Sequence, residues 1–142
     1  MPTKKLSDDK TADELADLAD RLVGRIWGHF QARVAEFGLS MPEAKVLQAL
    51  DGPEMVPMRT LAERVHANPS NITVVVARLD GRGYVTREGT SDRRVKGVRL
   101  TRAGLDLRRR LADRLREDHP AVGDLSPTQQ AALLRLLRAL DL

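Results

Sequence analysis

The chain has 142 residues, 42% of them hydrophobic, which excludes a disordered tail and is enough for a domain with a core. It contains no cysteine, which excludes disulfides, zinc–thiolate sites and thiol redox switching. The N-terminal stretch MPTKKLSDDK has no apolar signal core, and no apolar run approaches the length of a membrane span. We therefore expect a cytoplasmic protein with no membrane partner.

Positive charge is concentrated in the middle third of the chain. The net charge is +4, and residues 53–102 hold ten Lys and Arg against five Asp and Glu. The segments on either side are close to neutral. A local basic excess indicates a polyanionic partner, although a soluble protein with an Arg-rich surface has the same composition.

The first predicted element is one long amphipathic helix over residues 11–37. Thr11 and Glu14 have capping-box spacing, and Gly38 is a suitable C-cap. Apolar residues recur at the three- and four-residue steps of a single helix face. They are Leu15, Leu18, Leu22, Val23, Ile26, Trp27, Phe30, Val34 and Phe37.

Two short helices are predicted next. Ser40 and Glu43 form a second capping box, which starts a helix that ends at Gly52 and Pro53. Its apolar face is Ala44, Val46, Leu47 and Leu50. The other short helix covers about residues 59–65 and leads into the turn HAN.

Residues 72–76, ITVVV, are all β-branched, and by propensity alone they favour a strand. However, Asn68 and Pro69 just before them are a strong helix-start signal. The apolar side chains also follow helical spacing, at Ile72, Val75, Val76 and Leu79. Burying four such side chains contributes about 1.5–3 kcal/mol each, against propensity differences of a few tenths of a kcal/mol. We therefore predict a helix that ends at Gly83.

A charged hairpin and two more helices complete the predicted elements. The strands YVTRE and VKGVRL flank the turn GTSDRR. Thr101 then caps a helix with Leu105, Leu111 and Leu115 turned inward, which Pro120 and Gly123 break. The last helix begins at Ser126 and Pro127, with Gln129 closing a capping box.

Two short helices, a tight turn and a basic hairpin are the plan of a winged helix-turn-helix. The second helix presents Ser70, Asn71 and Thr73 near its N-terminus, where free N–H groups and the helix dipole favour phosphate. Val74 on the same outer face could touch a thymine methyl or could simply be tolerated there. The side chains expected to neutralise phosphates are Arg78 on this helix and Arg87, Arg93, Arg94 and Lys96 on the hairpin.

The hairpin sequence DRRVKGVRLT, followed by Gly104, resembles the wing of the MarR family of bacterial regulators. The resemblance extends to three further stretches: GLSMPEAKVLQAL, TLAERVHANPSNITVVVARLDGRGYV and LSPTQQAALLRLLRAL. It covers residues 11–142. The wing pattern together with the spacing of LAE and RLDGRG is fairly specific, whereas the terminal helices alone are weak evidence.

The resemblance implies a mainly α fold with a small β-hairpin wing (α+β), a winged helix-turn-helix flanked by N- and C-terminal dimerisation helices. It implies that Arg94 enters the minor groove and that Asp92 holds it by a salt bridge. It also implies a homodimer on a pseudo-palindromic operator, a repressor role, and a small-molecule effector in a crevice. The absence of cysteine argues against the thiol-oxidation branch of the family.

The expected organisation has four parts. Residues 1–10 form a flexible tail, 11–52 the N-terminal dimerisation and support helices, 53–102 the winged helix-turn-helix, and 103–142 the C-terminal dimerisation helices. Trp27 and Phe30 are candidate effector contacts, but large aromatics at helical spacing belong more often to a core or a dimer interface.

Other classes of function are less well supported. The sequence has no Gly-rich phosphate loop, and its serines lie in caps and turns, so an enzyme is not expected. The three histidines have no metal-ligand spacing, and we expect no metal or cofactor. A winged-helix adaptor that binds a protein partner and a non-specific architectural DNA binder remain as alternatives.

Overall fold

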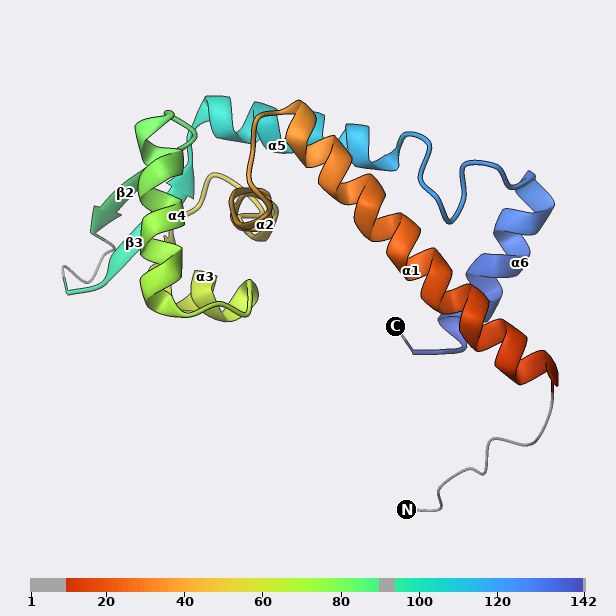
Figure 1. Cartoon of the computed structure of the whole chain (residues 1–142). Coiled ribbons are helices and arrows are strands. Elements are labelled where there is room, and N and C mark those ends of the chain that lie inside the picture. The colour runs from red at the N-terminus through yellow and green to blue at the C-terminus, as the bar shows by residue number, and fades with distance from the viewer. Residues whose placement is uncertain (1–9, 90–93, 142) are drawn as a thin grey trace, which may run out of the picture. The chain divides into compact units, whose positions relative to one another are not determined.

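The computed structural model describes residues 10–89 and 94–141 (Figure 1). Its elements, in chain order, are α1 (Lys10–Glu36), α2 (Met41–Ala49), β1 (Val56–Pro57), α3 (Met58–Arg64), α4 (Pro69–Gly81), β2 (Val85–Gly89), β3 (Lys96–Leu100), α5 (Arg102–Arg116) and α6 (Pro127–Arg138). The predicted fold class, mainly α with a small β wing, is confirmed. None of the helices so described is both long and apolar enough to cross a membrane.

The chain divides into two compact units. The central unit comprises residues 32–114, and the terminal unit comprises the described residues up to Gln31 together with those from Leu115 onward. The four predicted parts of the chain were defined by expected function, whereas the two units are defined by compactness. The four parts therefore stay a prediction.

Residues 72–76 are helical, as their spacing predicts. Ile72, Val75, Val76 and Leu79 are buried, and Thr73 and Val74 on the other face are exposed. The Oδ1 atom of Asn68 accepts a hydrogen bond from the Ser70 N–H at 2.9 Å, and Pro69 occupies the first helical position. The cap fixes the start of α4, and burial of one face overrides the strand propensity of the residues.

The core of the central unit forms where α2, α3 and α4 meet the sheet (Figure 1). The predicted apolar face of α2 is fully buried. The predicted capping box is present, with Ser40 Oγ accepting from the Glu43 N–H and the Glu43 carboxylate accepting from the Ser40 N–H. Other buried side chains are Val34, Leu39, Leu61, Val85, Val98, Leu100, Leu107 and Leu111.

The sheet has three antiparallel strands in the order β1-β3-β2. The predicted hairpin pairs Val85 with Leu100 at its root and Gly89 with Lys96 toward its turn. Strand β1 was not predicted, because it has only two residues and contains Pro57, which cannot donate to a ladder and is tolerated at a sheet edge.

Two expectations for the helices need correction. Helix α1 already includes Lys10, so Thr11 lies inside its first turn and not at the cap position. On α5 the buried leucines are Leu107 and Leu111, while Leu105 and Leu115 are only half-buried. Leu111 is buried as predicted, and Leu107 and Gly104 share the buried face of the helix with it.

Thr101 and Gly104 join the start of α5 to the turn that follows α4. The Thr101 hydroxyl donates to the Gly83 carbonyl at 2.6 Å and accepts from the Gly104 N–H at 3.0 Å. The Thr101 N–H donates to the Tyr84 carbonyl at 3.1 Å. A Cβ on Gly104 would lie 1.9 Å from that carbonyl oxygen, so only glycine fits this approach.

Within the central unit, the last turn of α1 is tied to α5 by an ion pair. Arg114 donates to both carboxylate oxygens of Glu36, at 2.7 and 3.1 Å, and Arg33 binds the same carboxylate. These hydrogen bonds, that from Arg114 first, lower the pKa of Glu36 below its ordinary value.

In the terminal unit, no residue within 10–31 and 115–141 is buried. Helix α6 has its predicted capping box between Ser126 and Gln129. His29 Nε2 lies 3.1 Å from the Leu115 carbonyl oxygen. The terminal unit therefore has well-formed helices and specific polar contacts, but no closed core of its own.

We expect Gly104→Ala to destabilise the protein by about 2–3 kcal/mol, because the added Cβ forces α5 away from the Tyr84 carbonyl. Gly81→Ala is the control, since a Cβ there meets nothing within 4 Å. It should raise stability by about 0.5–1 kcal/mol. Urea unfolding at one fixed protein concentration measures both changes, and equal effects would contradict the packing argument.

Candidate nucleic-acid interface

The outer face of α4 carries the residues predicted to read DNA. Ser70, Asn71, Thr73, Val74 and Arg78 are all exposed, and the buried side chains of the same helix point into the central unit. Placement on one accessible helix face is what a recognition helix needs in order to enter the major groove. All five lie on the exposed part of α4, and their contact with DNA stays a prediction.

Thr73 offers a hydrogen-bond acceptor on this face, and Val74 offers an apolar group. The Thr73 hydroxyl donates to the Pro69 carbonyl at 3.0 Å, so its oxygen remains available as an acceptor. Val74 is 52% exposed and presents a bare apolar group beside it. Such a face can accept a hydrogen bond from a base amino group and can pack against a thymine methyl.

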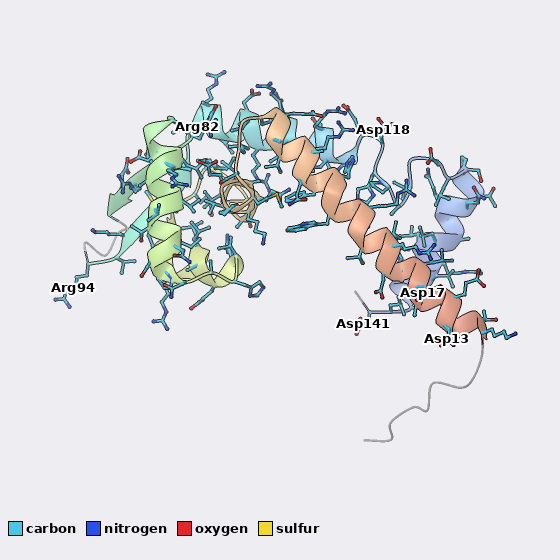
Figure 2. All side chains as sticks on the ribbon, in the orientation of Figure 1. Asp13, Asp17, Arg82, Arg94, Asp118 and Asp141 are labelled. Carbon is cyan, nitrogen blue, oxygen red and sulfur yellow. The ribbon has the colours of Figure 1, made fainter. Side chains whose placement is uncertain are left out.

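Arg82, which the sequence analysis did not single out, holds the C-terminal end of α4 (Figure 2). Its guanidinium donates to the Gly38 carbonyl at 3.0 Å, lies 3.7 Å from the Glu43 carboxylate and stacks 5.2 Å above the Tyr84 ring. Gly38 has a φ of +63°, so the chain turns sharply there and presents its carbonyl. The recognition helix is thus anchored to the corner between α1 and α2.

The hairpin carries a second exposed basic group. Arg94 and Lys96 are exposed, and Figure 2 shows Arg94 at the turn end of the hairpin, directed away from the sheet. Asp92 and Arg93 lie outside the described residues, so the expected contact between Asp92 and Arg94 stays a prediction.

Arg87 lies against the recognition helix. Its Nε donates to Asp80 Oδ2 at 2.9 Å, which joins β2 to the last turn of α4. A second pair, Arg99 with Glu88 at 3.3 Å, lies across the two strands of the hairpin. Sequence reasoning placed Arg87 among the phosphate contacts and did not consider Asp80 as its partner.

A concave surface of about 510 Å³ lies between α4 and the wing. Thr73 and Asp80 line it from the helix, and Arg87, Glu88 and Lys96 line it from the strands. The helix side of this surface thus carries a hydroxyl and a carboxylate, and the hairpin side carries two cations and one carboxylate. This arrangement suits a ligand that carries both base edges and phosphates.

The other candidate site residues lie elsewhere. Trp27 and Phe30 are in the terminal unit, with ring centroids 6.3 Å apart and planes inclined by 31°. Trp27 is 49% exposed and Phe30 is half-buried. Across residues 10–89 and 94–141, no group of three or more His, Asp and Glu side chains is placed to hold a metal ion.

Comparison with known proteins agrees with this geometry. Residues 39–96 match the model of the MarR family. A MarR-family transcriptional regulator from Silicibacter pomeroyi is 26% identical, with a TM-score of 0.65 over 87% of this chain and 84% of that one. No curated protein matches the chain in sequence.

Two further solved structures share the fold. Apo MarR from E. coli is 19% identical, with a TM-score of 0.74 over 89% of this chain and 96% of that one. BpsR from Bordetella bronchiseptica is 23% identical, with a TM-score of 0.64 over 90% and 98%. The BpsR structure concerns the mechanism by which 6-hydroxynicotinic acid regulates DNA binding by BpsR.

Proposed function

We propose that this chain regulates transcription by binding one operator sequence through α4 and the β2–β3 wing, in keeping with the match of residues 39–96 to the model of the MarR family. The single observation that carries the proposal is the exposed face of α4, where polar side chains, Val74 and Arg78 lie opposite a fully buried face. Small polar side chains and an arginine on one exposed helix face suit contact with base edges and phosphates.

The two elements divide the recognition between them. In the major groove, Ser70, Asn71 and Thr73 meet base edges and nearby phosphates, and Arg78 adds backbone charge. In the minor groove, Arg94 at the end of the hairpin supplies the inserted cation, as the family resemblance implies. Lys96 contacts phosphate and adds affinity without sequence information.

The DNA test begins with selection of binding sites from a random duplex pool. We expect an enriched two-fold symmetric site with half-sites about 10 base pairs apart. Anisotropy titrations with random competitor should then give a preference of about 10³-fold or more for that site. Arg94→Ala should remove much of this preference.

Other outcomes identify the alternative functions. Equal affinity for selected and random DNA would indicate an architectural binder. No DNA binding at all would indicate an adaptor for a protein partner.

We also propose that the chain acts as a homodimer formed through the terminal unit. This unit has no buried residue among those described, and its helices expose several large apolar side chains. They include Leu15, Leu18, Val23 and Trp27 on α1 and Leu134, Leu136 and Leu137 on α6. Apolar surface on this scale favours burial against a second copy, and a two-fold dimer matches a two-fold operator.

Leu18→Asp should therefore convert the dimer to a monomer, because it places a carboxylate in the buried interface. Val74→Asp is the matched control, since Val74 and Leu18 are both 52% exposed but Val74 lies on α4. Sedimentation equilibrium measures the mass of each variant. Loss of the dimer in both variants, or in neither, contradicts an interface at the terminal unit.

A small-molecule effector that lowers operator affinity, and a repressor role, complete the proposal. The BpsR structure, with its effector 6-hydroxynicotinic acid, supports the choice of aromatic acids as first compounds. Trp27 is the only tryptophan, so its emission reports binding near the Trp27–Phe30 pair. In vitro transcription from a promoter that overlaps the selected operator should fall when the protein is added.

An effector that shifts Trp27 emission should weaken operator binding by about 5- to 150-fold. By linkage, operator DNA should weaken effector binding by the same factor. Paired titrations with and without DNA measure both factors. A compound that binds at Trp27 and leaves operator affinity unchanged would count against this site as the effector site.

A further inference from the structure

We propose that Asp80 and Arg87 are a positioning pair that sets the angle of the wing against the recognition helix. Through this pair, the carboxylate of Asp80 strengthens operator binding although its charge repels phosphate. The inference rests on the proposed function, because the wing angle matters only if α4 and the wing bind one DNA together. It assigns Arg87 to orienting the wing, in place of direct phosphate contact.

The apolar packing of the hairpin is confined to its root. On β2, Val85 is buried and Thr86 half-buried, whereas Arg87, Glu88 and Gly89 are exposed. On β3, the buried Leu100 pairs with Val85, and the buried Val98 pairs with Arg87. Strand β1 pairs with β3 at Val56–Val98 and Pro57–Gly97, which holds the β3 side of the hairpin as far as Gly97. On the β2 side, no buried side chain fixes the strand against α4 from Arg87 onward.

The Asp80–Arg87 bond crosses the place where packing stops. The concave surface of about 510 Å³ lies between α4 and the strands, so side chains do not fill this space. The Nε–Oδ2 bond of 2.9 Å connects its two walls. Side-chain exposures of 33% for Asp80 and 47% for Arg87 mean that the pair adds little to global stability, so its consequence is local.

Two electrostatic effects disfavour a carboxylate at the position of Asp80. It lies in the last turn of α4, where the helix dipole favours cations, and it lines the surface proposed to face phosphates. Both effects oppose a carboxylate at this position. Its pairing with Arg87 gives the carboxylate a role that compensates for them.

The sign of one substitution separates positioning from simple electrostatics. Removing a carboxylate near DNA should tighten binding if charge alone matters. If the pair orients the wing, Asp80→Asn should instead weaken binding to the selected operator by about tenfold, a typical coupling for paired neighbours. Affinity for random DNA should stay the same or rise.

Glu88→Gln is the matched control. It removes one carboxylate from the same surface, but its ion pair lies within the hairpin and does not reach α4. We expect unchanged or slightly tighter binding to both DNAs. The charge swap Asp80→Arg with Arg87→Asp should recover most of the lost operator affinity, which a direct phosphate contact by Arg87 could not do.

A second readout needs no DNA. The chain has no cysteine, so Gln48→Cys on α2 and Val95→Cys in the hairpin allow two spin labels to be attached cleanly. With labelled protein diluted in unlabelled protein, pulsed electron resonance gives the label–label distance distribution within one chain. Asp80→Asn should broaden it, and Glu88→Gln should leave it unchanged.

The two readouts distinguish the inference from the function on which it rests. If the wild-type chain has no preferred operator but Asp80→Asn broadens the distances, the proposed function fails and the positioning of the wing stands. If operator binding is present while Asp80→Asn tightens it and leaves the distances unchanged, the positioning pair is overturned.

Discussion

Burial of one face of α4 is the constraint on which the rest of the central unit depends. Four side chains, Ile72, Val75, Val76 and Leu79, leave solvent only if residues 69–81 are helical. Once they are buried against α2 and α3, the position of the opposite face follows from helix geometry. The residues proposed to read DNA are therefore accessible because the apolar residues on the opposite face of α4 are buried.

A recognition surface also needs its parts held at fixed angles, and polar contacts do this where the core ends. Asn68 caps the start of α4, and Arg82 ties its end to the carbonyl of Gly38 and the carboxylate of Glu43. Thr101 bonds the turn after α4 to the start of α5. Each of these groups lies at an end of an element, where backbone donors or acceptors are otherwise unsatisfied.

The terminal unit shows the opposite balance. Helix α6 has a capping box at Ser126, but the apolar side chains of the unit remain partly or fully exposed among the residues described. Local signals are enough to form a helix, whereas a core needs a second surface to pack against. This difference between the units is why the proposed dimer is assigned to the terminal unit and the proposed DNA contacts to the central unit.

The sequence by itself determined the helices, the hairpin and the exposed face of α4, because caps, glycine turns and apolar spacing act over a few residues. Its motifs also resemble those of the MarR family, and the match of residues 39–96 to the family model confirms this resemblance. Sequence reasoning missed β1, the burial of Leu107 on α5 and the contacts made by Arg82 and Asp80. Asp80 left one trace in the sequence, an acidic residue at a helix C-terminus, where a cation is favoured.

Only the tertiary structure decided those points, since their partners are chosen in space. Arg82 donates to a carbonyl 44 residues away, and Arg87 could reach either phosphate or Asp80 until the hairpin was placed beside α4. Spacing along the chain predicts which face of a helix a residue occupies. It does not predict which distant group that face meets, because this depends on the packing of the whole unit.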